Sequence, residues 1–474
     1  MLWLALYFPD LPLQLFTRGR PEEWPLAVSH RYQGREVIAR CNRMAATCGV
    51  HPGLPLQAAL ALSGDLKIRA RDRRAEKQLL QELAQWAYQF SPQISFEPSL
   101  LLLEIGASLK LFGGRQALLQ KVQDDLPGLG LCSQWASAPT PMAAALLART
   151  RPGGHVPREQ LLAALAEVPV RRLTRDSQLR GLISDIGLQD IGECLRLPRP
   201  ELSRRAGPVL GLLFDRLLGE APDPREVWQP PEHFQQYLEL PAEISEHAAL
   251  VFPARRLVTA LCGFLRGHGM AAQRLQWCLL HREQAPTCFD QGLVTPSRDA
   301  SHILEMFRER IERVPLPAAT LGLRLRVDDA QAFEEASASL LEDAGVVQDH
   351  HLLERLRNRL GDQQVQGLCL APDYRPERAW CFCTPGASGE GVDGRAQQPP
   401  WLLSEPRPLR VVRQSPEYDG PLQVRSLPQR VESGWWDGCD IARDYFVALS
   451  RAGERLWVFR ERRSGRWFLH GLFS

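Results

Sequence analysis

Continuous apolar runs alternate with helically spaced apolar residues along the N-terminal third of the chain. Residues 2–8 are apolar or aromatic throughout, which predicts a strand buried on both faces of a sheet. Leucine, alanine and aromatic residues recur at helical spacing over residues 72–90, which predicts an amphipathic helix that Pro92 ends. Residues 100–105 repeat the apolar strand pattern. We therefore expect residues 1–155 to fold as an α/β domain with a mixed sheet.

Shorter patterns follow in the middle of the chain. Helical runs broken by glycine and proline fill residues 156–225 and predict a small helical region. After a proline-rich stretch, residues 226–375 alternate between strand-like and helix-like runs, which predicts an α+β domain. Its expected strands are residues 274–281 and 320–326, and its expected helices are residues 301–313 and 330–342.

The C-terminal part changes composition twice. Residues 385–408 are rich in glycine, proline, serine and glutamine, which predicts a flexible tether. Residues 409–474 are rich in tryptophan and arginine and carry alternating apolar positions, which predicts a small β domain. A core role is favoured over a binding surface for its tryptophans, which are Trp435, Trp436, Trp457 and Trp467.

Composition limits the class of protein but says little about partners. The chain has 474 residues, 44% hydrophobic and 24% charged, which excludes whole-chain disorder, collagen and a coiled-coil rod. Its net charge is only +2, so nucleic-acid binding has to be argued locally. The eleven cysteines lack zinc-finger spacing, the closest pair being Cys381 and Cys383. The apolar start is too short to span a membrane. We expect a cytoplasmic protein with reduced thiols and without metal or cofactor.

Six short motifs, in this order, resemble the palm and fingers of the Y-family (UmuC/DinB-like) translesion DNA polymerases. They occupy residues 3–6, 38–42, 49–55, 103–106, 111–113 and 135–141. The resemblance implies palm and fingers over residues 1–155, a helical thumb over residues 156–225 and a little finger over residues 226–375. The β-rich C-terminal domain would be an addition to that fold.

The same resemblance implies that the chemistry of these enzymes is lost. Such polymerases hold two Mg²⁺ ions with one aspartate from the first palm strand and an Asp-Glu pair from the second motif. Those positions are here Tyr7, Ser99 and Leu100. The nearby carboxylates lie at shifted positions, namely Asp10, Glu97 and Glu104. A catalytically inactive protein is the favoured interpretation, and an active translesion polymerase that uses displaced carboxylates is the alternative.

A polymerase-like chain without metal ligands resembles the polymerase-like subunit of the bacterial mutasome, and the tail of the chain resembles the tail of that subunit. The tail motifs are residues 432–438, 443–446, 456–460 and 467–473. This resemblance implies an adaptor in SOS-induced translesion synthesis and mutagenesis. The implied partners are the sliding clamp (beta subunit), a RecA-like protein, an error-prone DnaE-type polymerase and DNA.

The tether contains a degenerate clamp-binding peptide. Sliding clamps bind extended segments in which a glutamine orients the peptide and apolar side chains fill pockets. Gln397 is the expected polar anchor and Trp401 the main apolar anchor. The complete expected peptide consists of Gln397, Pro399, Pro400, Trp401, Leu402 and Leu403. The alternative is that Trp401 and Leu402 pack against the domain that follows.

DNA contacts are expected from the thumb and the little finger. Gly187 and Gly192 could present backbone N–H groups to phosphates. The expected arginine contacts are Arg204, Arg205, Arg266, Arg274, Arg324 and Arg326. Strand alternation places the last two on one face, so the contacts should be electrostatic and not sequence-specific. In the β-rich domain, the expected surface contacts to a protein or to single-stranded DNA are Arg443, Arg460 and Arg466.

Overall fold

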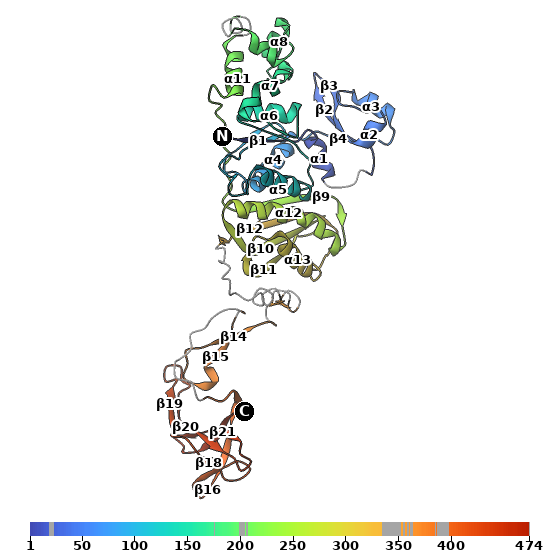
Figure 1. Cartoon of the computed structure of the whole chain (residues 1–474). Helices are drawn as coiled ribbons and strands as arrows, with labels where there is room; N and C mark the ends of the chain where they lie inside the picture. Colours follow the sequence, from blue (N-terminus) through green and yellow to red (C-terminus); the bar gives the residue numbers. More distant parts are fainter. Residues whose placement is uncertain are drawn as a thin grey trace. The chain divides into compact units, whose positions relative to one another are not determined.

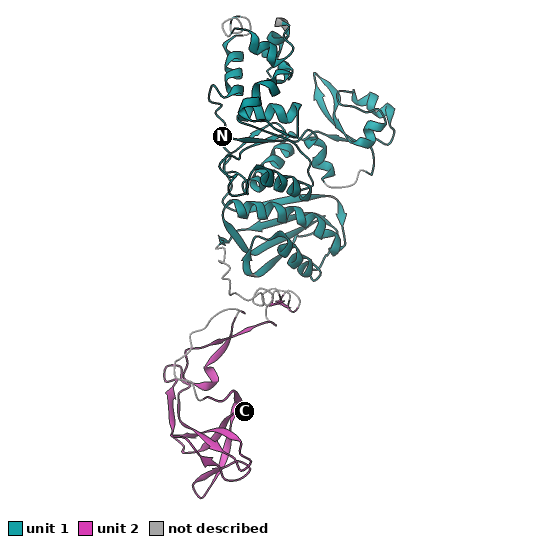
Figure 2. Ribbon diagram, viewed as in Figure 1, with its two compact units in different colours: residues 1–346 teal, residues 347–474 magenta. Residues whose placement is uncertain are grey.

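The computed structural model divides the chain into two compact units. Figure 2 shows residues 1–346, the N-terminal unit, and residues 347–474, the C-terminal unit. The structure describes residues 1–18, 23–174, 176–198, 204, 207–333, 352–353, 356–357, 360, 364–383, 385 and 398–473.

A five-stranded mixed sheet forms the palm-like centre of the N-terminal unit (Figure 1). In spatial order its strands are β5 (Ile94–Glu97), β6 (Leu100–Glu104), β1 (Trp3–Tyr7), β7 (Gln134–Ala138) and β8 (Gly154–His155). The helices that cover it are α4 (Arg73–Ala87), α5 (Arg115–Gly128) and α6 (Pro141–Thr150). Because side chains alternate along β1, Leu4 and Leu6 pack with α4 and α5, whereas Trp3 and Ala5 pack with α6. The apolar run at the N-terminus is therefore buried on both faces, as predicted.

A fingers-like subdomain follows the first strand. Its elements are β2 (Leu26–Tyr32), β3 (Arg35–Cys41), α2 (Arg43–Thr47), α3 (Leu56–Leu62) and β4 (Lys67–Ala70), and α1 (Leu11–Thr17) leads into it. The strands form a separate sheet in the order β3-β2-β4. Gly49 and Gly53 adopt left-handed φ values of +85° and +90° between the two helices. The turns at these glycines separate α2 from α3.

A thumb-like helical region packs on the far side of α6. Its helices are α7 (Leu161–Ala166), α8 (Ser177–Ile186), α9 (Ile191–Arg196) and α11 (Pro208–Leu218), and short 3-10 turns η1 (Arg158–Gln160) and η2 (Val170–Arg172) flank α7. Leu210, Phe214 and Leu217 of α11 join the same core cluster as α6. The thumb-like region and the palm thus share one hydrophobic core.

The little-finger-like domain is a sheet backed by two helices. In spatial order its strands are β11 (Thr287–Ser297), β10 (Met270–His281), β12 (Thr320–Val327) and β9 (Phe234–Ile244), with β13 (Ala330–Ala332) beside β10. The helices are α12 (His247–Gly267) and α13 (Ala300–Ile311). The expected helix over residues 330–342 begins instead as strand β13, and its remainder from residue 334 lies outside the described residues.

Helix α12 joins this domain to the palm by packing closely on α4. A Cβ added to Gly263 would lie 2.7 Å from the Trp86 carbonyl oxygen, and one added to Gly267 would lie 2.7 Å from the Tyr88 ring. Glycines at this spacing let the two helices approach without side chains between them. One core cluster runs from β1 and α4 through α12 to the little-finger-like sheet.

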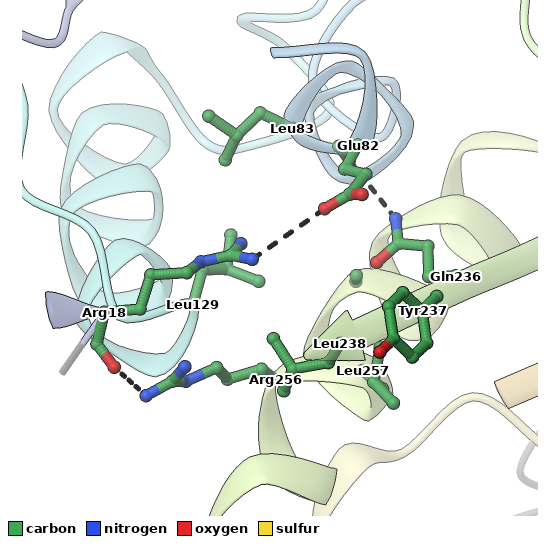
Figure 3. Close-up of a pocket in the computed structure, with 10 residues that line it drawn as sticks. Arg18, Glu82, Leu83, Leu129, Gln236, Tyr237, Leu238, Arg256 and Leu257 are labelled. Atoms are coloured by element: carbon green, nitrogen blue, oxygen red, sulfur yellow. Dashed lines mark hydrogen bonds and ion pairs between the residues drawn. The ribbon is translucent and has the colours of Figure 1, made fainter. Parts of the chain in front are cut away.

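The edge of this joint contains partly buried polar groups (Figure 3). The Arg18 guanidinium lies 3.9 Å from the Glu82 carboxylate, and Arg256 donates a hydrogen bond to the Arg18 carbonyl oxygen. Burial lowers the pKa of Arg18 and raises that of Glu82. The cavity between them has a volume of about 20 Å³, room for one water molecule. It is a joint and not a ligand site.

Among the described residues, α12 is also the one helix long and apolar enough to cross a membrane. However, 67% of its apolar window is buried inside the structure. It is therefore a core helix between the palm helices and the little-finger-like sheet.

The C-terminal unit consists of a hairpin and a seven-stranded sheet. The hairpin strands are β14 (Gly367–Leu370) and β15 (Trp380–Cys383), joined through the 3-10 turn η3 (Pro376–Arg378). The sheet strands are β16 (Trp401–Val412), β17 (Ser415–Glu417), β18 (Gln423–Val424), β19 (Gln429–Ser433), β20 (Ile441–Leu449), β21 (Arg455–Glu461) and β22 (Trp467–Leu472). Arg375, 4% exposed, ties the hairpin turn to the sheet through a 2.7 Å ion pair with Asp437.

Two expected boundaries differ from the structure. Residues 401–408 belong to strand β16 and not to a flexible tether, because Trp401 and Leu402 pair with Leu472 and Gly471 of β22. Residues 367–375 belong to the C-terminal unit and not to the little-finger-like domain, because the hairpin turn is held by Asp437. Both contacts join residues more than 60 positions apart, so local composition does not report them.

The burial of the tryptophans and the bonding of the cysteines also differ from what the sequence predicted. Trp457 is a buried core residue, but Trp435 and Trp436 are 80% and 59% exposed, so the tryptophans do not form one core. Disulfides join Cys278 to Cys288 and Cys369 to Cys383, whereas reduced thiols were expected. Strand pairing brings each pair together: the first pair lies directly opposite across β10 and β11, with Cα atoms 4.1 Å apart.

Candidate functional site

The three positions that the sequence resemblance assigns to the lost metal ligands lie together at one edge of the palm. Tyr7, at the end of β1, pairs with Leu100, at the start of β6. The Phe8 amide donates a 2.8 Å hydrogen bond to the carbonyl oxygen of Ser99, which turns the chain from β5 into β6 with a φ of +57°. Leu100 is fully buried. The structure thus brings a phenol, a hydroxyl and a leucine together here, and none of them is a carboxylate.

Glu97 is the carboxylate nearest to these positions in the chain, and two arginines hold it. Arg149 of α6 and Arg225 of the segment after α11 contact its two oxygens at 2.6 and 2.7 Å. Arg225 also pairs with Asp223 at 2.7 Å. Burial alone would raise the pKa of Glu97, but the two guanidiniums outweigh it and hold the pKa below its ordinary value.

This ion-pair cluster places positive charge beside Tyr7. The Arg149 guanidinium lies 5.7 Å from the centre of the Tyr7 ring. A Mg²⁺ ion would have to displace two arginines from Glu97 and would be repelled by them. In this arrangement both oxygens of Glu97 are paired with guanidinium groups.

The other two displaced carboxylates lie elsewhere. Asp10 is half exposed and faces Arg40, whose Nε lies 3.4 Å from it and donates to the Pro9 carbonyl oxygen. Glu104 is buried and accepts hydrogen bonds from the amides of Leu2 and Gly106 at 3.0 and 3.1 Å. It pairs with Trp3 at the far end of β1, four residues or about 13 Å from Tyr7. The three carboxylates therefore do not converge.

The little-finger-like sheet presents three of the expected arginines on one exposed face. Arg324 and Arg326 alternate with buried leucines on β12, and Arg274 lies on the same face of neighbouring β10. Arg326 is 2.6 Å from Asp328, and Arg274 is 3.9 Å from Asp290. These pairs are exposed, so they leave the arginines available to exchange partners.

The remaining expected DNA contacts are scattered. Gly187 caps α8 in the left-handed conformation and is exposed. Gly192 instead permits close packing, because a Cβ there would lie 2.9 Å from the Ala166 carbonyl oxygen. Arg266 lies in the last turn of α12 and donates a hydrogen bond to the Arg298 carbonyl oxygen, on the helix side of the sheet. Arg204 is exposed, and Arg205 lies outside the described residues.

The expected clamp peptide is partly built into the C-terminal sheet. Gln397 lies outside the described residues, and Pro399 packs on Gly471. Leu402 and Leu403 contribute to hydrophobic clusters of the sheet, in line with the packing alternative. Trp401 is 68% exposed and remains available to a partner.

The three arginines expected at a partner surface differ in their surroundings. Arg443 is only 14% exposed and is held by Glu377 at 3.1 Å and by the Tyr445 hydroxyl at 3.0 Å. It is therefore a structural residue and not a surface contact. Arg460 and Arg466 are exposed near the turn between β21 and β22.

The chain is similar to one protein family and to curated relatives. Residues 13–149 match the impB/mucB/samB family. The chain is 27% identical over 467 residues to Protein ImuB of Caulobacter vibrioides strain NA1000 / CB15N, covering 90% of this chain and 100% of that protein. The chain resembles ImuB. ImuB of strain ATCC 19089 / CIP 103742 / CB 15 matches with the same values. The resemblance to ImuB extends over both units of the chain.

Solved structures with similarity to the chain are Y-family polymerases. The Y-family DNA polymerase chimera Dbh-Dpo4(243-245)-Dbh aligns with a TM-score of 0.41 and 16% identity, covering 69% of this chain and 99% of that chain. DinB from Sulfolobus solfataricus aligns with a TM-score of 0.38 and 15% identity, covering 70% and 100%. The structure has the predicted mixed α/β region followed by a β-rich C-terminal domain, and the impB/mucB/samB match lies within the first of these.

The sequence resemblance named Tyr7, Ser99 and Leu100, and the structure places them together, but sequence reasoning missed the two arginines nearby. Arg149 is 52 residues and Arg225 is 128 residues from Glu97 along the chain. Neither arginine lies in a recognisable motif. Only the folding of α6 and of the segment after α11 onto the sheet edge brings them together.

Proposed function

We propose that the chain is a catalytically inactive, polymerase-like scaffold that acts in the cytoplasm during SOS-induced translesion DNA synthesis. It binds DNA, the sliding clamp, the RecA-like protein ImuA and the error-prone DnaE-type polymerase ImuC, and it makes no phosphodiester bond itself. The runner-up is a translesion polymerase that uses displaced carboxylates.

One observation carries the proposal. Tyr7, Ser99 and Leu100 occupy the edge of the palm where two Mg²⁺ ions would have to bind, and the adjacent Glu97 is neutralised by Arg149 and Arg225. Two-metal phosphoryl transfer needs carboxylate oxygens on both ions. The neutralised cluster favours the inactive scaffold over the runner-up.

DNA binding is supported by the exposed face of the little-finger-like sheet. Arg274, Arg324 and Arg326 are spaced along two adjacent strands, as a phosphate backbone running across the sheet requires. Contacts of arginines to phosphates carry no sequence information, so the proposed binding is not sequence-specific. A scaffold of this kind follows DNA without selecting a site.

Clamp binding rests on Trp401. This side chain is exposed at the start of β16, directly after the segment that carries Gln397, and a large exposed aromatic is the typical anchor of a protein interface. Trp401→Ala should weaken binding of the purified chain to the sliding clamp at least tenfold, or about 1.4 kcal/mol, in calorimetry. Leu427→Ala, which removes a side chain 89% exposed in the same unit, is the matched control and should bind normally. Equal affinities for the two variants would remove Trp401 from the interface.

Primer extension decides between scaffold and enzyme. The purified chain is incubated with a primed template, all four deoxynucleotides and Mg²⁺ or Mn²⁺, beside an active Y-family polymerase as positive control. We expect no extension above background. The isosteric variant Asp10→Asn/Glu97→Gln/Glu104→Gln distinguishes the alternatives. Extension by the wild type that this variant loses would establish a polymerase with displaced carboxylates and overturn the proposal.

A further inference from the structure

Three cysteines share one face of the hairpin in the C-terminal unit. Across β14 and β15, Cys369 lies directly opposite Cys381, and Gly367 lies opposite Cys383. Alternate residues of a strand point to the same face, so the three cysteines project together. The opposite face carries exposed apolar side chains, which are Leu368, Leu370, Trp380 and Phe382.

Two of these cysteines form a disulfide and the third does not. Cys369 and Cys383 are joined diagonally across the hairpin with Cα atoms 5.9 Å apart, and Cys381 is a free, exposed thiol. With that bond in place, the described residues contain no group of three His, Cys, Asp or Glu side chains that could hold a metal ion. Reduction changes this, because it leaves three thiols on one face of one hairpin. In a reducing cytoplasm the reduced form is the one expected.

We propose that in the reduced chain Cys369, Cys381 and Cys383 bind one zinc ion, with water as the fourth ligand. Thiolates are the ligands that select Zn²⁺, and at a Zn–S distance of 2.3 Å the sulfurs of a tetrahedral site lie about 3.8 Å apart. Directly opposed residues have Cβ atoms about 5 Å apart, and residues two apart on one strand lie about 7 Å apart. Side chains from these positions can converge on a point above the face. The spacing Cys-x-Cys alone gave no such indication, because the third ligand comes from the partner strand.

A thiol-specific reductant supplies the electrons that open the Cys369–Cys383 disulfide. Reduction of the Cys369–Cys383 bond takes two electrons and two protons, and the reductant is oxidised by two electrons, as a dithiol is when it closes to its own disulfide. Three thiols then bind Zn²⁺ as thiolates and release up to three protons. Zinc binding therefore strengthens as the pH rises through the range where thiols ionise.

A disulfide or a metal ion would stabilise this hairpin. A two-stranded sheet is marginally stable alone, and small elements commonly rely on a disulfide or a metal. Arg375 and Asp437 fix the turn end of this hairpin, whereas Cys383 lies at its open end. A zinc ion would hold the open end where a disulfide does not persist.

Metal analysis of the full chain tests the proposal. The chain is purified with a phosphine reductant, which does not compete for zinc as a dithiol does, then equilibrated with Zn²⁺ and desalted. Elemental analysis should give about one zinc per chain. Cys381→Ser should fall below about a tenth of that value, although it leaves both disulfide-forming cysteines intact. Cys48→Ser, which removes an exposed cysteine of the N-terminal unit, should keep the metal.

A second readout guards against misfolding of the variant. Cobalt(II) added to the reduced wild type should give thiolate-to-cobalt charge-transfer absorption, and Cys381→Ser should lose it while its circular dichroism is unchanged. Wild type without zinc, or Cys381→Ser with as much zinc as wild type, would overturn the site and leave the three cysteines as a disulfide with a spectator thiol.

Discussion

At Glu97, burial and charge act in opposite directions, and charge wins. The carboxylate is only 23% exposed, yet Arg149 and Arg225 keep it ionised by contacting both of its oxygens. A partly buried carboxylate in this state stabilises the fold only while it is charged. Because its pKa is lowered in the folded chain, that stabilisation is present above the ordinary glutamate pKa and is lost as the pH falls through the folded value.

The pH dependence of a Glu97→Gln variant follows from this sign. At pH 7 the variant should unfold at a lower urea concentration than wild type, with a free energy of unfolding lower by about 1–3 kcal/mol. Arg149 then loses its ion pair with Glu97, and Arg225 keeps only its ion pair with Asp223. The difference should shrink as the pH is lowered below about 4.5, because the carboxyl is then protonated first in the unfolded chain and, below its lowered pKa, also in the folded chain. Urea midpoints between pH 3 and pH 7 measure it. Glu159→Gln, at an exposed position of η1, should show a constant difference.

Among the elements, helices α4 and α12 can pack closely because glycines of α12 place no side chain at their interface. Gly263 has the Trp86 carbonyl oxygen, the Trp86 ring and the Gln89 side chain within 3 Å of where a Cβ would be. Backbone cannot yield as a side-chain end can, so added volume forces the helices apart. Gly181 of α8, by contrast, has nothing within 4 Å of such a Cβ.

Replacement by alanine should change the stability of the chain in opposite directions at these two glycines. Gly263→Ala should destabilise the chain by about 1–3 kcal/mol through overpacking. Gly181→Ala should be neutral or stabilise it by up to about 1 kcal/mol, because glycine in a helix interior costs conformational entropy. Thermal or urea unfolding of both variants gives the comparison. Destabilisation by Gly181→Ala of the same size would show that the α4–α12 contact is not what Gly263 serves.

The sequence predicted the helices and strands better than it predicted which segments pair or pack with one another. Continuous apolar runs and helical spacing located β1, α4 and β6 because those patterns are local. The sequence could not assign residues 401–408 to a strand, since pairing with β22 outweighs their proline-rich composition. That Tyr7, Ser99 and Leu100 replace metal ligands rests on the sequence resemblance alone and stays a prediction. The ion pairs of the neighbouring Glu97 were not predicted, because Arg149 and Arg225 reach it only through the fold.

For the molecule as a whole, a net charge of +2 gives no general attraction to nucleic acid. The proposed DNA binding therefore needs a local cluster of positive charge, and we assign it to Arg274, Arg324 and Arg326. Each phosphate contact releases counterions and adds about 0.9 to the slope of log affinity against log salt concentration.

Removing this face should therefore change the salt dependence as well as the affinity. Arg274→Gln/Arg324→Gln/Arg326→Gln should reduce the magnitude of the slope by about 2 to 3 in fluorescence anisotropy titrations at several salt concentrations. Arg308→Gln/Arg310→Gln/Arg313→Gln changes the net charge equally in and after α13, on the helix side of the sheet, and should alter the slope little. If both variants lose the same slope, the sheet face does not bind the backbone and only net charge matters.

Cutting the chain in the segment between α11 and β9 should not yield two parts that fold independently. Arg225 pairs with Glu97, and the Trp228 amide donates a 2.8 Å hydrogen bond to the Ile94 carbonyl oxygen, so this connection lies along the edge of the palm sheet. Beyond it, α12 shares a core with α4. A protease that cut the connection would leave a nicked chain whose two fragments migrate together under native conditions and part only in denaturant. An expression fragment that ended there would carry a bare apolar helix face and would be a substrate for chaperones and degradation, not a working half of the protein.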